Sequence, residues 1–371
     1  MAENQRVTSF APRIADWQTR AGRHGLPWQG TRDPYRIWLS EVMLQQTQAS
    51  TVIAYYERFL ALFPDVTALA AADPDTVMHA WAGLGYYARA RNLQRCARIL
   101  AYETNGCFPR TAQALAQLPG IGPSTAAAIA AFAFGAREPI LDGNVKRILA
   151  RYFGVVGDPS TRAVEQNLWS LAHAVLEAAP ADLDMTAYTQ GQMDLGALVC
   201  TRHQPDCARC PLNASCHARQ HGQQHLLPTP RQRRARPERS CLMLILECQG
   251  HLLLHKHASP GIWGGLWGLP QFDTPDALRA ACGTMGVAGG DTDSDEPSRL
   301  AGISHAFTHF RLHIEPWWLR ANACRLPAPG PNEAWVPITR LGATALPAPL
   351  EKLLGGLYPP SDANPDEGGV N

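Results

Sequence analysis

The chain of 371 residues lacks any apolar run of the ~18–20 residues that a membrane-spanning helix needs. The stretch from Met1 to Arg20 mixes charged and apolar side chains and has no signal-peptide core. An excess of one charge is also missing, because 33 Lys and Arg residues offset 32 Asp and Glu residues and leave a formal net charge of +1. We therefore predict an intracellular protein, cytoplasmic in a bacterium, with no membrane partner.

Charged residues make up only 18% of the chain and apolar residues 46%, which is typical of a folded globular protein. The length predicts two or three domains. The net charge does not indicate whether the protein binds nucleic acid, but two stretches of the chain are locally basic. The first holds Arg89, Arg91, Arg95 and Arg98 with no acid among them, and the second runs from Arg231 to Arg239 around a single Glu238. Such stretches can form a phosphate-binding face, although a solvated tether explains the second equally well.

Residues 1–220 are predicted to form a helical domain. Ala-rich amphipathic runs such as 49–62 and 125–134 alternate there with short turns that contain Pro or Gly. Asp73 and Asp158 each stand directly before a proline and are predicted to N-cap the following helix.

Residues 221–239 are polar and are predicted to be a linker. Strand patterns follow at 241–247, at 251–255 and within 310–319, and Gln249-Gly250 is predicted to turn the first pair into a hairpin. We therefore predict a smaller α/β domain over 240–357 and a disordered tail over 358–371.

Ten cysteines in an intracellular chain do not predict a disulfide framework. Four of them cluster with the spacing C-x6-C-x2-C-x5-C, at Cys200, Cys207, Cys210 and Cys216. Four thiolates this close can bind one metal centre. Paired zinc motifs usually contain two close C-x2-C pairs, and only one is present. The spacing therefore favours an iron–sulfur cluster, with zinc as the alternative.

The segment Leu118 to Ala126 predicts a helix–hairpin–helix turn. It has the order apolar, Pro, Gly, apolar, Gly and then a helix start, with its glycines at 120 and 122 and Ser124 in the first turn of the helix. The N–H groups of that helix start would be available to a DNA phosphate. An ordinary interhelix turn is the alternative.

Two carboxylates are candidates for acid–base chemistry. Glu41 is the lone acid of an apolar helical stretch, where burial can raise its pKa and make it a proton donor. Asp142 precedes a predicted helix, so it is either an N-cap, a catalytic group or both. The stretch Gly83 to Arg89 places aromatic residues between glycines and an arginine, a pattern suited to a wedge in a base stack, although core tyrosines are the alternative.

These motifs together resemble the endonuclease III-type DNA glycosylase superfamily and, within it, the MutY-type adenine DNA glycosylases. The closer resemblance rests on Leu26-Pro27-Trp28, on the stretch from Glu41 to Gln48, on 83–87 and on 141–147. It implies a mainly α catalytic region of two helical subdomains with a loop holding a [4Fe-4S] cluster. It also implies excision of adenine mispaired with 8-oxoguanine or guanine in double-stranded DNA, by a monomer.

The resemblance also assigns roles. Glu41 would protonate N7 of adenine, Asp142 would stabilise the oxocarbenium ion, and Asn144 would hold a water or orient Asp142. Trp28 and Gln190 would line the adenine pocket. The remaining contacts with DNA would come from Gln46, Thr47, Leu84, Tyr86, Gly120, Gly122 and Ser124, with Tyr86 and Gln46 filling or wedging the duplex and Thr47 near 8-oxoguanine.

The C-terminal part resembles Nudix domains at Gly261 to Pro270. The paired glutamates of a Nudix hydrolase are missing, since the chain has Leu278 to Gly283 where they would stand, so this domain is expected to bind and not to hydrolyse. In the resembled enzymes it recognises 8-oxoguanine through a Phe-Ser-His element. Here that element is Phe307, Thr308 and His309.

Bifunctional relatives carry a lysine where this chain has Ser124, so the resemblance implies a monofunctional glycosylase. Three alternatives stay open. They are an endonuclease III-like pyrimidine glycosylase/lyase, an iron–sulfur DNA-binding protein without chemistry, and a Nudix pyrophosphatase.

Overall fold

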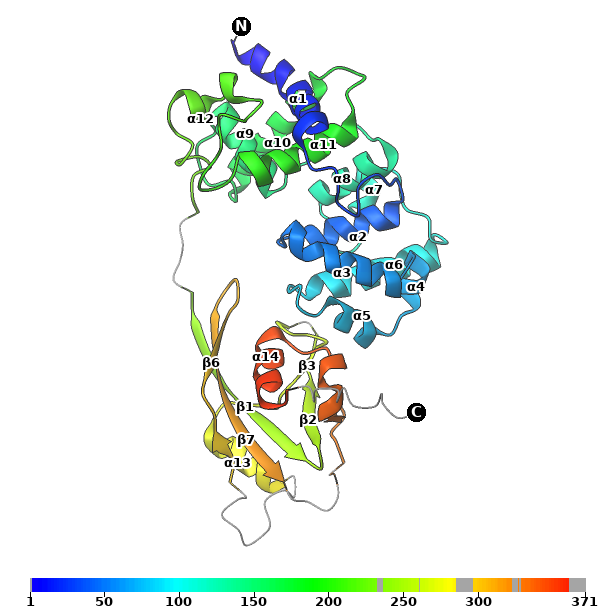
Figure 1. Cartoon of the computed structure of the whole chain (residues 1–371), viewed down its shortest axis with the longest axis vertical. Helices are drawn as coiled ribbons and strands as arrows, with labels where there is room; N and C mark the ends of the chain where they lie inside the picture. The colour runs from blue at the N-terminus through cyan, green and yellow to red at the C-terminus, as the bar shows by residue number, and fades with distance from the viewer. Residues whose placement is uncertain are drawn as a thin grey trace, which may run out of the picture. The chain divides into compact units, whose positions relative to one another are not determined.

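The computed structural model describes residues 2–231, 236–259, 261–284, 296–321, 326 and 328–359 (Figure 1). Contacts between residues divide the chain into two compact units. The first unit comprises 1–72 and 91–233, and the second comprises 73–90 and 234–371. Arg233, Arg234 and residues 360–371 of the predicted tail lie outside the described residues. The predicted domain boundaries remain predictions.

The first unit is built from helices, which confirms the mainly α prediction for this part of the chain. Its elements are α1 (Ala2–Ala21), α2 (Pro34–Leu44), α3 (Ala49–Leu62), α4 (Val66–Ala71), most of α6 (Ala88–Glu103), α7 (Ala112–Leu115), α8 (Pro123–Phe134), α9 (Gly143–Phe153), α10 (Arg162–Glu177), α11 (Met185–Asp194) and α12 (His217–Gln220). A π-helical turn over Leu195–Val199 continues α11, and a 3-10 turn covers Asn213–Ser215.

Carboxylate caps fix where several of these helices begin. Asp65 accepts a hydrogen bond from the Ala68 N–H at 2.8 Å, and Asp142 accepts one from the Val145 N–H at 2.8 Å. Asp73 caps α5 (Pro74–Trp81) of the second unit in the same way, as predicted. The prediction for Asp158 was wrong. Its carboxylate accepts from the Ser160 N–H within a turn, and α10 starts only after Thr161.

The core of the first unit is centred on α8. Seven of its twelve residues are buried apolar side chains, mostly alanines, so neighbouring helices approach it closely. Helices α2, α7 and α11 all contact it. The cluster that includes Phe10, Ile14, Tyr152 and Tyr188 fills the space around α1, α9 and α11. This packing holds the N-terminus of α9 and the length of α11 in place, and these two carry Asp142 and Gln190.

The second unit contains one sheet of eight strands among the described residues. They are β1 (Glu238–Cys248), β2 (His251–Lys256), β3 (Trp267–Gly268), β4 (Gln271–Phe272), β5 (Ser298–Arg299), β6 (Ile303–Ala306), β7 (Arg311–Ala321) and β8 (Glu333–Pro337). The order along the sheet is β3-β2-β1-β7-β5, with β4 on β1, β6 on β7 and β8 on β2. The long strands β1 and β7 pair in parallel, and the other pairs are antiparallel (Figure 1).

The predicted hairpin is confirmed, since Cys248 pairs with His251 and both turn residues have positive φ, 48° at Gln249 and 70° at Gly250. Helix α13 (Pro275–Thr284) packs on β1 and β4, and its Leu278 and Cys282 join a buried cluster with Leu244, Leu246 and Leu319. A 3-10 turn over Ile338–Ala343 precedes α14 (Ala348–Leu357). None of the described helices is long and apolar enough to cross a membrane.

Candidate active site

A cavity of about 530 Å³ opens in the first unit, between α1, α2, α8, α11 and the loop after α1. Its size falls within the ~300–1,000 Å³ usual for small-molecule sites. Trp28, Glu41 and Gln190 all line it. The fold therefore brings three of the predicted site residues from distant parts of the chain to one place.

Glu41 lies on α2, which Asp33 caps through the Tyr35 N–H at 2.9 Å and in which Pro34 takes a first-turn position. Its neighbours Ser40 and Val42 are buried, while Glu41 itself reaches the cavity. Burial and, to a smaller extent, the charge of Asp142 raise the pKa of the Glu41 carboxyl to about 8. Glu41 therefore holds a proton at neutral pH and can donate it into the cavity.

Asp142 is both an N-cap and the neighbour of Glu41. Burial raises the pKa of its carboxyl, but the Val145 and Asn144 N–H groups and the positive charges of Arg147 and Lys146 act in the opposite direction. No such donors oppose the raised pKa of Glu41. Hydrogen-bond donors and positive charges, which stabilise a carboxylate, thus act on Asp142 but not on Glu41.

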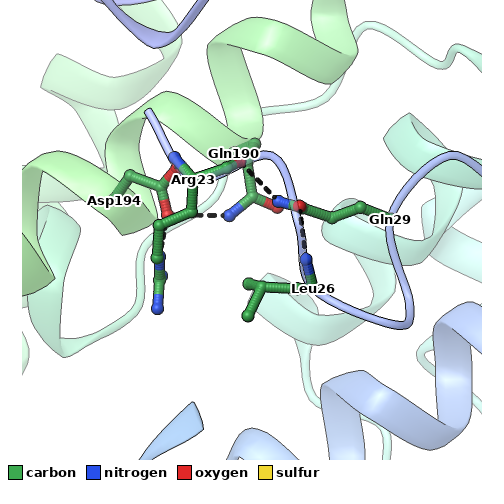
Figure 2. Close-up of polar contacts among 5 residues, drawn as sticks. All are labelled: Arg23, Leu26, Gln29, Gln190 and Asp194. Carbon is green, nitrogen blue, oxygen red and sulfur yellow. Dashed lines mark hydrogen bonds and ion pairs between the residues drawn. The ribbon is translucent and has the colours of Figure 1, made fainter. Parts of the chain in front are cut away.

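Gln190 is oriented by a network that Figure 2 shows. Its Nε2 donates to Asp194 Oδ1 at 2.9 Å, one turn further along α11. Asp194 is fully buried and also accepts from Arg23, from Nε at 2.6 Å and from the backbone N–H at 2.9 Å. Because one N–H of Nε2 is bound to the carboxylate, the Gln190 amide is held in one orientation, with its oxygen, Oε1, available as an acceptor. Among the residues that the structure describes, none donates to that oxygen.

The same network shapes the loop that carries Trp28. Gln29 Nε2 donates to the Arg23 carbonyl at 2.9 Å, and Gln29 Oε1 accepts from the Leu26 N–H at 3.1 Å. Trp28 is buried and packs edge-on against Tyr56, with ring centroids 5.4 Å apart. Sequence reasoning missed Arg23, Gln29 and Asp194. The one available signal was an acid four residues after Gln190, on the same face of a helix.

Gln46 and Thr47 lie in the loop that follows α2. The helix ends at Leu44, and Gln46 is exposed with φ at 60°, a left-handed conformation that is uncommon for residues other than glycine. Gln45 Nε2 donates to Thr125 Oγ1 at 3.3 Å, which ties this loop to α8.

The turn before α8 has the geometry that the sequence predicted. Gly120 has φ at 80°, and a Cβ there would stand 2.8 Å from the Asn92 Cβ, so both conformation and space require glycine. Gly122 is the N-cap and Pro123 opens the helix. Ser124 Oγ accepts from the Leu141 N–H at 3.0 Å, so this side chain holds the residue directly before Asp142.

Asn144 is held from two sides. Its Oδ1 accepts from Arg147 NH2 at 2.8 Å, and Gly196 packs so closely that a Cβ there would lie 2.4 Å from the Asn144 Cβ. Arg147 also donates to the Gly196 carbonyl at 2.7 Å and to the Cys200 carbonyl at 2.7 Å. Arg147 therefore connects the start of α9 to the first cysteine of the four-cysteine loop.

The four predicted metal ligands, Cys200, Cys207, Cys210 and Cys216, line one small pocket. The buried Arg151 borders it and donates to Cys200 Sγ at 3.3 Å and to the Thr201 carbonyl at 2.6 Å. Within the described part of the chain, no group of three or more His, Cys, Asp or Glu residues is placed to hold a single metal ion. Four thiols that line one pocket form a donor set suited to a metal centre.

The other predicted contacts lie in the second unit. Leu84 is buried, whereas Tyr86 is 48% exposed and has φ at 49°. Phe307, Thr308 and His309 form the turn between β6 and β7, closed by a hydrogen bond from the Phe307 N–H to the Phe310 carbonyl at 2.9 Å. Thr308 and His309 are exposed on it.

Comparison with known proteins agrees with this geometry. Residues 39–174 match the HhH-GPD superfamily of base excision DNA repair proteins, and residues 241–355 match the NUDIX domain. An adenine DNA glycosylase of Buchnera aphidicola subsp. Baizongia pistaciae is 32% identical over 346 residues, 93% of this chain and 95% of that protein. The human adenine DNA glycosylase is 35% identical over 372 residues, 84% of this chain and 67% of that protein. The solved structure of a thermostable thymine-DNA glycosylase is 27% identical, with a TM-score of 0.53, and covers 60% of this chain and 100% of that chain.

Fold and site together define an enzyme of DNA base excision repair, a helix–hairpin–helix glycosylase with a C-terminal Nudix-like domain. The chain belongs to the adenine DNA glycosylase family.

Proposed function

We propose that this enzyme excises adenine paired with 8-oxoguanine or guanine in double-stranded DNA, as a cytoplasmic monomer, and leaves an abasic site. One observation carries the proposal. Glu41, whose pKa is raised to about 8, reaches the same cavity as Trp28 and Gln190. A proton donor, an aromatic side chain and an oriented amide are what recognition and departure of a purine require.

The amide geometry favours adenine. Because one N–H of Gln190 Nε2 donates to Asp194, the amide is held in an orientation that leaves Oε1 as an acceptor for a base in the cavity. Adenine offers an amino group at N6, which can donate to that oxygen. Guanine and hypoxanthine offer a carbonyl oxygen at the equivalent position, and two acceptors repel each other.

Excision requires that the adenine leave the base stack and enter the cavity. Glu41 then gives its proton to N7, and the C1′–N9 bond breaks with its electron pair passing to the base. The positive charge that develops on the sugar is stabilised by the Asp142 carboxylate. Water adds to C1′ and returns a proton to the Glu41 carboxylate, so adenine and an abasic sugar are the products. This is the division of labour between two carboxyl groups that glycosidases use.

The chain's own residues favour cleavage without a strand break. The position where the resembled bifunctional enzymes carry a lysine is Ser124, whose Oγ is engaged with the Leu141 N–H. Lys146, the amine four residues after Asp142, is engaged in an ion pair with Glu165 at 2.5 Å. An amine held in this contact is not positioned to form the Schiff base on which strand cleavage depends.

We further propose that Cys200, Cys207, Cys210 and Cys216 hold a [4Fe-4S] cluster. The pocket that the four cysteines share, and a spacing with only one C-x2-C pair, support this choice over zinc. When bound, the cluster would cross-link the loop and supply a one-electron redox centre. Arg147 and Arg151 tie that loop to α9, so the cluster would also steady the helix that Asp142 caps.

The turn of Phe307, Thr308 and His309 is proposed to contact 8-oxoguanine. Phe307 and Phe310 stack with ring centroids 4.7 Å apart, and Arg239 lies over the Phe310 ring at 4.6 Å, so the turn has a rigid aromatic base. The Thr308 hydroxyl retains a hydrogen-bonding group where the resembled element has serine. Helix α13 holds a single acid, Asp276, which is paired with Arg279 at 3.1 Å, and this is no site for Mg²⁺-dependent hydrolysis.

The proposal is tested by incubating an excess of the protein with DNA duplexes that hold adenine opposite 8-oxoguanine, guanine or thymine, and with a duplex that holds thymine glycol. We expect the abasic product to form fastest when adenine faces 8-oxoguanine and next fastest when it faces guanine. Strand breaks should appear only after treatment with alkali. Strand breaks without alkali, or activity confined to a thymine glycol duplex, would favour the endonuclease III-like alternative. Tight DNA binding with no product on any duplex would favour the protein without chemistry.

Asp194→Asn tests the orientation of the Gln190 amide. The asparagine amide can donate as well as accept, so the Gln190 amide is free to reverse. We expect adenine release to slow about 10–100-fold, with a smaller loss for hypoxanthine. Asp16→Asn, the same change at an exposed position on α1, is the control. Equal losses for adenine and hypoxanthine, in a variant whose circular dichroism is unchanged, would contradict the proposed orientation.

A further inference from the structure

The segment between α5 and α6 forms a tight turn that exposes one aromatic side chain. Gly83 and Gly85 have φ at 93° and 70°, and Tyr86 has φ at 49°. Leu84 and Tyr87 on either side are buried, at 5% and 7% exposure, whereas Tyr86 is 48% exposed. A large aromatic residue in a left-handed conformation on the surface is unfavourable on both counts, so surrounding contacts must hold it there.

Those contacts come from two side chains. Trp81, fully buried at the end of α5, donates from Nε1 to the Gly85 carbonyl at 3.2 Å. Arg89, in the first turn of α6, donates from NH2 to the Leu84 carbonyl at 3.1 Å and to the Gly85 carbonyl at 3.3 Å. The Arg89 backbone N–H also donates to the Tyr86 carbonyl at 2.8 Å. Arg89 therefore holds the carbonyls of three consecutive turn residues, Leu84, Gly85 and Tyr86.

Arg89 also contacts the exposed ring itself. Its guanidinium carbon lies 5.6 Å from the centroid of the Tyr86 ring and 5.3 Å from that of the Trp81 ring. A planar guanidinium can contact both rings and still donate from one edge to two carbonyls, which an ammonium group on a flexible stem cannot do. The side chain thus links the buried indole, the turn backbone and the exposed phenol.

We propose that Arg89 is a positioning residue for base extrusion, which holds the Gly83–Tyr86 turn in shape so that Tyr86 enters the base stack as a pre-formed wedge. This inference rests on the proposed function and deepens it, since the ligand of the turn is the stacked duplex beside the extruded adenine. A wedge that is already ordered loses less conformational entropy on insertion than one that must be ordered by DNA. Arg89 would act through Tyr86, without touching the reacting atoms.

The test is stopped-flow fluorescence on a duplex that carries a fluorescent base analogue next to an adenine–8-oxoguanine pair, followed by adenine release on the same sample. Arg89→Gln is expected to slow both the fluorescence rise and the release about tenfold, and Arg89→Lys to fall between it and the wild type. Arg162→Gln, which removes a positive charge from an exposed position on α10, is the control and is expected to match the wild type. Equal effects of Arg89→Gln and Arg162→Gln would overturn the inference, because loss of charge alone would then explain them.

Two further measurements separate positioning from general damage. In a Tyr86→Ala background Arg89→Gln should add no further slowing, because both changes remove the same wedge. On a duplex whose adenine faces an abasic-site analogue, and is already poorly stacked, the deficit of Arg89→Gln should shrink to about twofold. Additive effects, or a deficit that persists on the poorly stacked duplex, would overturn the inference. Absence of adenine release by the wild type would overturn the proposed function itself, whereas a fluorescence rise unchanged in Arg89→Gln would overturn only the role of Arg89.

Discussion

Glu41→Gln is expected to lower the single-turnover rate of adenine release about 10²–10⁴-fold, the usual contribution of a positioned general acid. Glutamine keeps the shape of the side chain but has no proton to give to N7. Binding to the uncleaved duplex should be unchanged, because the variant removes the chemical step and leaves the surface intact. A Glu41→Gln protein that releases adenine at the wild-type rate would remove Glu41 from the mechanism.

Glu41→Gln is also expected to change the thermal stability of the protein. The pKa of Glu41 is raised from its usual 4.5 to about 8 in the folded protein. Between pH 4.5 and pH 8, the folded protein therefore keeps a proton on Glu41 that the unfolded chain has already lost. The stability contributed by this group is present below pH 4.5 and is lost as the pH rises towards 8. Glutamine does not titrate. At pH 8 the melting temperature of Glu41→Gln should therefore exceed that of the wild type by about 10 °C, and the difference should vanish below pH 4.5.

Asp142→Asn is expected to lower the rate about 10²–10³-fold, because the developing positive charge on the sugar loses its counter-charge. Asparagine is as good an N-cap as aspartate, so α9 should keep its start and the protein its stability. Asp65→Asn is the matched control, since Asp65 caps α4 through the Ala68 N–H in the same way but, unlike Asp142, has no electrostatic effect on Glu41. The account predicts a normal rate for Asp65→Asn and would be contradicted by equal losses in the two variants.

Local features of the fold were predictable from the sequence. The run 49–62 contains no Gly or Pro and became α3 with the same bounds. Gly250 readily adopts the positive φ that a two-residue hairpin turn requires, and Gln249-Gly250 became that turn. Asp158 shows where local signals fail. An aspartate before proline can also start a simple turn. Helix α10 begins only after its N-cap Thr161, two residues after the proline.

The site was predictable residue by residue but not as an arrangement. Glu41 stood out as a lone acid in an apolar helix, and Gln190 entered only through the family resemblance. Asp194, which orients Gln190, and Arg23, which completes the buried pair, were missed because they are 171 residues apart and meet only when α1 packs on α11. The closeness of Glu41 to Asp142 depends in the same way on the packing around α8, which no local pattern encodes.

The most direct test of the account is the pH dependence of adenine release by the wild type from an adenine–8-oxoguanine duplex, under single-turnover conditions and with the released base identified by mass spectrometry. Because the acid form of Glu41 is the reactive one and its pKa is about 8, the account predicts free adenine as the only base, released at a rate that falls as the pH rises through about 8. Release of another base, or a rate that climbs across this range, would contradict it.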